Sequence, residues 1–331
     1  MIRLNLFFLI ILIPGSLAAE PPMEEQVRFV MGTTATVQAW APDSEMAASA
    51  TDAAFAAFAR VDSLMSTWRD DSALCSLNKS KPGQWTDVGG EVCQVLQQAK
   101  AVAAASEGAF DPTILPLVRV WGFRGGQAAL PDSAGLAIAL GAVNHRQLEL
   151  DPESGRARLL EPGMAVDLGG IAKGYALDCA AAAMRQNGAT GGVVDLGGNI
   201  LAFGQGPSHQ VGIVDPTRED RLLATIPLAD ASVATSGQYE RFMTIEGRRY
   251  GHILDPRTGR PVPAGVSVTV VADKAILADA LATAAVVLGM ELGLDLLEGM
   301  PDVEGIIVNV DDDGVLDLVT TSGFASFRVT D

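Results

Sequence analysis

The segment 275–290, AILADALATAAVVLGM, is apolar on every side, and this constrains the fold more than any other stretch. A helix without a polar face has to be buried, so the segment predicts a core helix covered by other elements. Its one charge is Asp279, and Thr283 shares the same face four residues further on. A carboxylate beside a hydroxyl suits a hard cation such as Mg²⁺. Hydrogen bonds from backbone amides to Asp279 are the alternative.

A second informative stretch, MAVDLGGIAKGYALD, spans residues 164–178. It passes from an apolar, strand-like start through DLGG into a helix expected over 171–186. Adjacent glycines before a helix let backbone amides approach an anion such as phosphate, although the same pair also occurs in plain turns. Residues 193–198, VVDLGG, repeat the entry of this stretch, either as a faint duplication or as a recurrent turn.

Elsewhere the chain alternates runs of strands with helices. Strands are expected over 28–39 with an interruption at Met31-Gly32, and then over 147–150, 156–160, 199–203, 209–214, 222–227, 231–235, 239–246, 249–254, 265–271, 305–310, 315–320 and 325–329. Helices are expected over 44–68, 91–105, 133–140, 275–290 and 291–298. This order is typical of an α+β fold with largely antiparallel sheets flanked by helices. The echoed motif would allow two intertwined similar subdomains within one domain over 27–330.

The acidic charge balance limits the partners of the protein. The formal net charge is −17, whereas nucleic-acid binding depends on Lys and Arg that neutralise phosphates. We therefore expect no nucleic-acid partner. An anionic ligand would need backbone amides or a metal ion, because the overall field repels it.

The N-terminus indicates export. Arg3 precedes an apolar run over 4–13, and small residues over 14–19 offer a cleavage site, so residues 1–18 are expected to be a signal peptide and the protein periplasmic. An uncleaved segment would instead hold the protein at the inner membrane. No cysteine lies in this segment, so no lipid anchor is expected.

Three cysteines, Cys75, Cys93 and Cys179, lack metal-ligand spacing and are expected to be structural. In an oxidising compartment Cys75 and Cys93 could pair. Among the histidines, His252 stands at an expected strand end before the turn 255–259. That position suits a general base near neutral pH, and a structural role is the alternative.

A series of motifs in this sequence resembles, in the same order, the signatures of the FAD:protein FMN transferases, the ApbE family. They are MGT at 31–33, MSTW at 65–68, GAFDPT at 108–113, VWGF at 120–123, DLGGIAKGY at 167–175, ATSGQYERF at 234–242, HILDPRTG at 252–259 and ADALATA at 278–284. The resemblance extends from about Phe29 to Phe327. It departs at Gly251, where many relatives have a second histidine.

The resemblance implies an activity and a site. The family binds FAD with its diphosphate on Mg²⁺, transfers the FMN half to a Thr or Ser hydroxyl of a partner flavoprotein, and releases AMP. A membrane redox-complex subunit is a partner of the implied kind. The implied Mg²⁺ ligands are Asp279, Thr283 and the backbone carbonyl of Gly170, and His252 falls at the catalytic base. The implied FAD contacts are Met31, Trp68, Ala109, Phe110, Asp111, Asp167, Lys173 and Ile253.

Several roles stay open at this point. Lys173 could hold a phosphate, pair with Asp167 or be solvated. Trp68 and Phe110 could stack on flat rings or belong to the core. An FAD pyrophosphatase with water as acceptor and a non-enzymatic periplasmic FAD carrier are the rival functions. A carrier would have no need of the base His252.

Overall fold

The computed structural model describes residues 21–123, 130–206, 209–237, 242–245, 247–311, 313–326 and 328–329. Within these ranges helices flank largely antiparallel sheets, which confirms the predicted α+β class. The expected signal peptide over 1–18 lies outside the described residues, and so does part of the ATSGQYERF motif.

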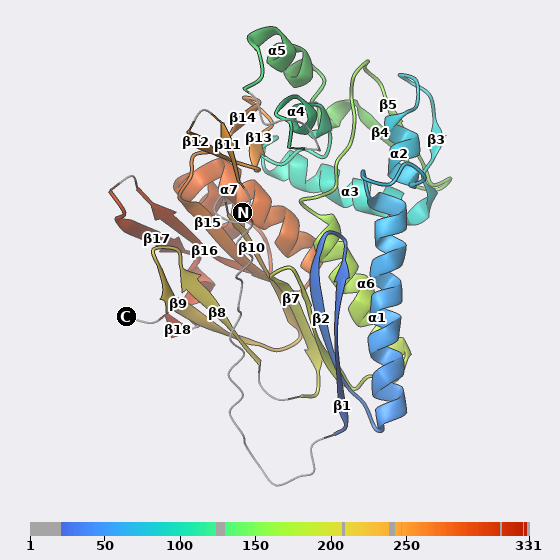
Figure 1. Ribbon diagram of the computed structural model, residues 1–331, viewed down its shortest axis with the longest axis vertical. Helices are drawn as coiled ribbons and strands as arrows, with labels where there is room; N and C mark the ends of the chain where they lie inside the picture. Colours follow the sequence, from blue (N-terminus) through green and yellow to red (C-terminus); the bar gives the residue numbers. More distant parts are fainter. Residues whose placement is uncertain are drawn as a thin grey trace.

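An eight-stranded sheet organises the fold, in the order β1-β2-β6-β7-β10-β15-β16-β17 (Figure 1). Its strands are Met23–Val30, Thr33–Trp40, Gly191–Leu196, Asn199–Gly204, Ala231–Gly237, Val266–Ala272, Val303–Val310 and Leu316–Thr320. All neighbouring pairs are antiparallel. Because successive side chains point to opposite faces, each central strand contributes to two apolar clusters, one on each side of the sheet.

Three long helices cover one face of this sheet: α1 (Ser44–Met65), α6 (Ala172–Gln186) and α7 (Ala275–Glu298). The opposite face is covered by a three-stranded sheet, β18-β9-β8, whose strands are Arg328–Val329, Arg218–Leu228 and His209–Asp215. Residues 325–329 were expected to extend the terminal hairpin, but the strand β18 within this range pairs with β9 instead.

Smaller elements surround one end of the helical layer (Figure 1). The helices are α2 (Ala73–Asn78), α3 (Gly89–Ala105), α4 (Leu115–Val120) and α5 (Ser133–Gly141), with a 3₁₀ turn at His145–Gln147, while a second 3₁₀ turn at Ser322–Ser326 lies on the opposite face of the sheet. The strands are β3 (Thr86–Asp87), β4 (Leu148–Asp151), β5 (Arg156–Leu159), β11 (Phe242–Ile245), β12 (Arg248–Gly251), β13 (Leu254–Asp255) and β14 (Arg260–Pro261). The elements α3, α5, β4, β5, β11 and β12 correspond to predicted ranges, whereas α2, α4, β3, β13, β14 and the 3₁₀ turns were not expected.

Helix α7 is the core helix that its sequence predicts. By length and composition it could cross a membrane, but it packs against β10, β15 and β16, which accounts for its apolar surface. A non-helical Gly289, with φ 76° and ψ −167°, divides it where two helices were expected. The backbone N–H groups of Ala275 and Ile276 each donate to the carboxylate of Asp178 in α6 at 3.0 Å. This contact satisfies two amides at the start of α7 that have no partner within the helix.

Two expectations about local structure were wrong. Residues 28–39 do not form one interrupted strand, because β1 and β2 are a hairpin whose turn is Met31-Gly32. Met31 adopts φ 48° there, a left-handed conformation that a Met rarely takes and that sequence patterns do not reveal. Residues 164–166 were expected to be strand-like, but the only bridge outside named strands joins Ala165 to Ile114, within the described residues.

The two DLGG copies take different conformations. Residues 167–170 lead into α6, whereas 195–198 form the turn between β6 and β7, with φ angles of 62° at Gly197 and 90° at Gly198. The echo is therefore one of sequence and not of backbone conformation. The echo alone therefore gives no support to the expectation of two similar subdomains, and β6 and β7, which flank its second copy, belong to the continuous eight-stranded sheet.

All three cysteines are free thiols in the structure. Cys75 and Cys93, the pair considered for a disulfide, are buried, while Cys179 is half-buried. Burial raises the pKa of the Cys93 and Cys179 thiols above the ordinary value. A thiol with a raised pKa is a weaker nucleophile near neutral pH, which agrees with a structural role for Cys93 and Cys179.

Candidate functional site

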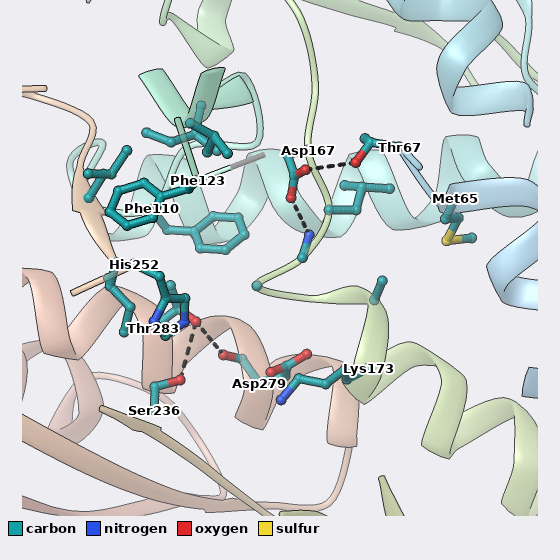
Figure 2. Close-up of a pocket in the computed structure, with 18 of the residues that line it drawn as sticks. Met65, Thr67, Phe110, Phe123, Asp167, Lys173, Ser236, His252, Asp279 and Thr283 are labelled. Carbon is teal, nitrogen blue, oxygen red and sulfur yellow. Dashed lines mark hydrogen bonds between the residues drawn. The ribbon is translucent and has the colours of Figure 1, made fainter. Parts of the chain in front are cut away.

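One pocket of about 530 Å³ brings together every site residue that the sequence predicts. It lies among the start of α6, the first half of α7, β10 and the loops that carry Thr67, Phe110 and His252 (Figure 2). The predicted residues that line it are Met31, Trp68, Ala109, Phe110, Asp111, Asp167, Gly170, Lys173, His252, Ile253, Asp279 and Thr283. Segments far apart in the sequence therefore meet at one place.

Asp279 is 2% exposed, and its two carboxylate oxygens have different partners. The backbone N–H of Gly174 donates to Oδ2 at 2.9 Å, and the side-chain amide of Asn199 donates to Oδ1 at 2.8 Å. The sequence-based alternative was that backbone amides satisfy the Asp279 carboxylate. Only one of its two donors is a backbone amide, so this alternative holds only in part. Both donors are neutral, so they satisfy the oxygens without cancelling the charge.

Thr283 stands one helical turn after Asp279 and reaches the same part of the pocket. Its Oγ1 donates to the backbone carbonyl of Asp279 at 3.2 Å and lies 3.4 Å from the hydroxyl of Ser236 in β10. Figure 2 shows these three side chains together, with His252 beside them. Ser236 was part of a matched motif without an assigned role, and the structure places it next to Thr283.

Gly170 allows the loop before α6 to approach Thr283 closely. A Cβ at Gly170 would lie 3.2 Å from Thr283 Oγ1 and 3.2 Å from the Phe110 ring. The loop backbone, the hydroxyl and the Asp279 carboxylate thus offer oxygen ligands, which are the ligands that Mg²⁺ prefers. Among the described residues no three His, Cys, Asp or Glu gather as a metal cluster. The donor set fits Mg²⁺.

The DLGG loop is held in place by its own side chain and by its neighbours. Asp167 accepts the Gly169 N–H at 2.7 Å and the Thr67 hydroxyl at 3.1 Å (Figure 2). From the other side, Asn78 in α2 binds the backbone of Val166 twice, donating to its carbonyl at 2.8 Å and accepting its N–H at 2.6 Å. The loop that carries Gly170 is therefore fixed by side chains of α2 and of the segment after α1.

Lys173 lines the pocket at the start of α6 and makes no ion pair with Asp167. Its positive charge instead acts on Asp195, whose pKa is nevertheless raised because burial disfavours the carboxylate. The pairing of Lys173 with Asp167 that the sequence allowed is therefore absent. Lys173 supplies positive charge to an otherwise acidic pocket.

The two aromatic candidates differ in exposure. Trp68 is 69% exposed at the pocket, so it is not a core residue. Phe110 is 5% exposed and forms part of the pocket wall. The sequence could not distinguish these two positions: a helix was expected to reach Trp68, but α1 ends at Met65, and Phe110 lies in a short segment without periodicity.

The side chain of Asp111 has a structural role. Its Oδ1 accepts the Thr113 N–H and hydroxyl at 2.8 and 2.6 Å, and its Oδ2 accepts the backbone N–H of His145 and meets its Nδ1 at 3.0 Å. Four hydrogen bonds fill this buried carboxylate. Asp111 therefore faces the pocket without a free acceptor, and its contact to a ligand would come through the backbone.

His252 is the histidine that lines the pocket. It lies half-buried in the segment between β12 and β13. His145 is engaged by Asp111, and His209 is buried beside the ring of Trp40, where burial lowers its pKa. His252 lies beside Thr283 in the pocket (Figure 2), a position that an imidazole acting as a base would need.

Comparisons with known proteins agree with this arrangement. The model of the ApbE family matches residues 31–307. The FAD:protein FMN transferase of Treponema pallidum is 35% identical over 318 residues, which cover 89% of this chain and 87% of that protein. That of Salmonella typhimurium is 32% identical, covering 84% and 82%. The protein belongs to the ApbE family.

Solved structures show the same fold. The flavinyl transferase ApbE of Pseudomonas stutzeri, in its apo form, has a TM-score of 0.82 at 27% identity, over 93% of this chain and 97% of that one. The ApbE protein of Thermotoga maritima has a TM-score of 0.82 at 30% identity, over 93% and 100%. The fold is therefore shared with solved members of the family.

Three residues that support predicted site residues were not themselves predicted: Asn199, Gly174 and Thr67. Each acts through a hydrogen bond to a predicted residue. Asn199 directly follows the second DLGG motif, so the echo was the available signal for it. Gly174 lies inside a helix, where a glycine is unfavourable unless close packing requires it.

Proposed function

We propose that this protein is a Mg²⁺-dependent FMN transferase, which moves the FMN half of FAD to a Thr or Ser hydroxyl of a partner protein and releases AMP. The observation that carries the proposal is the convergence of Asp279, Thr283, Gly170 and His252 in one pocket. Membership of a family whose relatives are named FAD:protein FMN transferases supports it.

The oxygen ligands of Asp279, Thr283 and Gly170 would hold Mg²⁺. When bound, the ion supplies positive charge to the diphosphate of FAD, which the acidic protein would otherwise repel. Phosphoryl transfer needs positioning and charge neutralisation more than covalent help from the protein. Lys173 adds a second positive charge within the same pocket.

His252 is proposed to act as the base. Its imidazole takes the proton from the acceptor hydroxyl while that oxygen bonds to the phosphorus of the FMN half. The bond from this phosphorus to the bridging oxygen breaks, and AMP leaves with the electron pair. The product is a phosphoester between FMN and the acceptor side chain.

Recognition of FAD is assigned to the remaining residues of the pocket wall. The exposed ring of Trp68 and the wall formed by Phe110 offer flat apolar surfaces for the rings of FAD. Met31, Ala109, Ile253 and the backbone of Asp111 complete this surface, and Asp167 holds the DLGG loop beside it.

An FAD pyrophosphatase is the second candidate, because the half-buried His252 could activate a water in the same pocket. Cleavage would then give FMN and AMP without a protein acceptor. A carrier of FAD without enzymatic activity is less consistent with a histidine placed beside Thr283.

The location and the acceptor complete the proposal. Residues 1–18 would direct export to the periplasm, or remain uncleaved and hold the protein at the inner membrane. The acceptor would be an exported flavoprotein with an accessible Thr or Ser, such as a subunit of a membrane redox complex.

The test mixes purified protein, FAD and Mg²⁺ with exported flavoprotein domains that carry an exposed Thr or Ser. A fluorescent flavin band that survives denaturing electrophoresis supports transfer. Release of only free FMN and AMP, with every acceptor tried, would establish the pyrophosphatase instead.

A further inference from the structure

The second DLGG motif, at residues 195–198, sets the position of the residue that follows it. Gly197 and Gly198 have left-handed φ angles, which glycine adopts at little cost. Asp195 Oδ1 accepts the N–H of Gly198 at 2.8 Å and closes the turn. Asn199 is therefore placed as the first residue of β7, next to the buried face of α7.

Asn199 is 1% exposed, and its Nδ2 donates to Asp279 Oδ1 at 2.8 Å. The orientation of the amide follows from this contact, because an ionised carboxylate only accepts hydrogen bonds. The second oxygen of Asp279 accepts the N–H of Gly174. Gly174 lies after the first DLGG motif and Asn199 lies after the second. One residue after each motif therefore donates to the carboxylate of Asp279.

We infer that Asn199 is a positioning residue, which holds the Asp279 carboxylate in the orientation in which it lines the pocket and thereby sets the affinity for a divalent cation. The inference rests on the proposed function, since the cation belongs to it. Asn199 suits this role because it donates without a charge. A Lys or Arg at the same position would neutralise Asp279 and compete with the metal.

The oxygen of the Asn199 side-chain amide argues against a role in packing alone. Its Oδ1 is buried and has no hydrogen-bond partner among the described residues. A buried acceptor without a partner destabilises the fold, so an apolar residue would serve packing alone better. The one hydrogen bond that the side chain makes is the one to Asp279.

The test uses Asn199→Leu, which removes the donor at nearly constant volume. Mn²⁺ serves as the probe, because it takes oxygen ligands as Mg²⁺ does and the free ion is visible by electron paramagnetic resonance. Titrations are run on the full protein without FAD and with FAD. We expect the Kd for Mn²⁺ to rise about 10- to 100-fold, the range for residues that orient a metal ligand.

Ser232→Ala is the matched control. Ser232 is also 1% exposed and donates a buried hydrogen bond, to the carbonyl of Ala272 at 2.6 Å, but makes no contact with Asp279. Its Kd for Mn²⁺ should stay within about twofold of the wild type. If Asn199→Leu does not fold, Asn199→Ser replaces it, because the serine hydroxyl is too short to reach Asp279.

A kinetic measurement separates positioning from general damage. In the Asn199 variant, the Mg²⁺ concentration for half-maximal turnover of FAD should rise with the Kd, while kcat at saturating Mg²⁺ falls much less. A folded Asn199 variant that binds Mn²⁺ as tightly as the wild type would overturn the role of Asn199 alone. A wild type that binds no Mn²⁺, with or without FAD, would overturn the proposed metal site as well.

Discussion

The backbone N–H of Gly174 and the carboxylate of Asp279 are joined by a hydrogen bond of 2.9 Å where α6 crosses α7. A Cβ at Gly174 would lie 2.1 Å from the carbonyl oxygen of Ala275 and 2.8 Å from the Cβ of Asp279. The two helices can therefore meet at this distance only because position 174 lacks a side chain. The helix that carries the proposed metal ligands is docked through this contact.

Gly174→Ala should force α6 away from α7. Overpacking of this kind costs about 1–3 kcal/mol of unfolding free energy, which urea titration measures. Gly90→Ala is the control, since a Cβ at Gly90 in α3 meets nothing within 4 Å, and it should leave stability unchanged or raise it slightly. Equal effects of the two substitutions would contradict the close approach of the helices.

Asp279→Ala should remove the only carboxylate of the proposed metal site and leave the amides of Asn199 and Gly174 without their acceptor. We expect kcat/KM for FAD to fall about 100-fold or more and the dependence of the rate on Mg²⁺ to disappear. Asp71→Ala, at an exposed position, is the control. Full activity of the Asp279 variant would show that the metal binds elsewhere.

His252→Ala should separate chemistry from binding. Removing a general base lowers kcat by about 10²- to 10⁴-fold, whereas FAD binding, measured by quenching of flavin fluorescence, should change little. His145→Ala serves as a contrast, since His145 is held by Asp111 and its loss should affect stability first. A His252 variant with near-normal turnover would remove the assigned base.

Asp178 should make stability depend on pH in acid. Burial raises its pKa above the ordinary 3.8, so the folded state binds the proton more tightly than the unfolded state. Stability contributed in this way is present at low pH and is lost as the pH rises through the range directly above 3.8. Asp195, whose pKa is also raised by burial, contributes in the same direction.

Asp178→Asn tests this dependence, because the amide oxygen can still accept from the start of α7 but does not titrate. Urea midpoints are measured at closely spaced pH values between about 4 and 6. The wild type should lose more stability than the variant as the pH rises across this range. Parallel curves for the two proteins would exclude a raised pKa at Asp178.

Local patterns predicted much of the fold. The apolar segment 275–290 could only be a core helix, and α7 is one. The β1–β2 hairpin was missed because its turn depends on the left-handed conformation of Met31. The residue type gives no indication of this conformation, because methionine rarely adopts it. The pairing of β18 with β9 was missed because it joins segments separated by much of the C-terminal part of the chain.

The site was predicted residue by residue through resemblance to a family, and the structure gathers those residues in one pocket. What the sequence could not supply is the support behind them. Asn199 reaches Asp279 only because β7 runs beside α7 in the assembled sheet. Likewise, no local sequence pattern indicates that the carboxylate of Asp111 is hydrogen-bonded to His145.

The double hydrogen bond between Asn78 and the backbone of Val166 has a consequence for ligand capture. An asparagine side chain carries both a donor group and an acceptor. Here they bind the carbonyl and the N–H of one residue, as the backbone of a neighbouring β-strand would. The loop before α6 is consequently in place before any nucleotide arrives. Association then requires no ordering of this segment, so the conformational entropy that mobile phosphate loops lose on binding is already lost during folding.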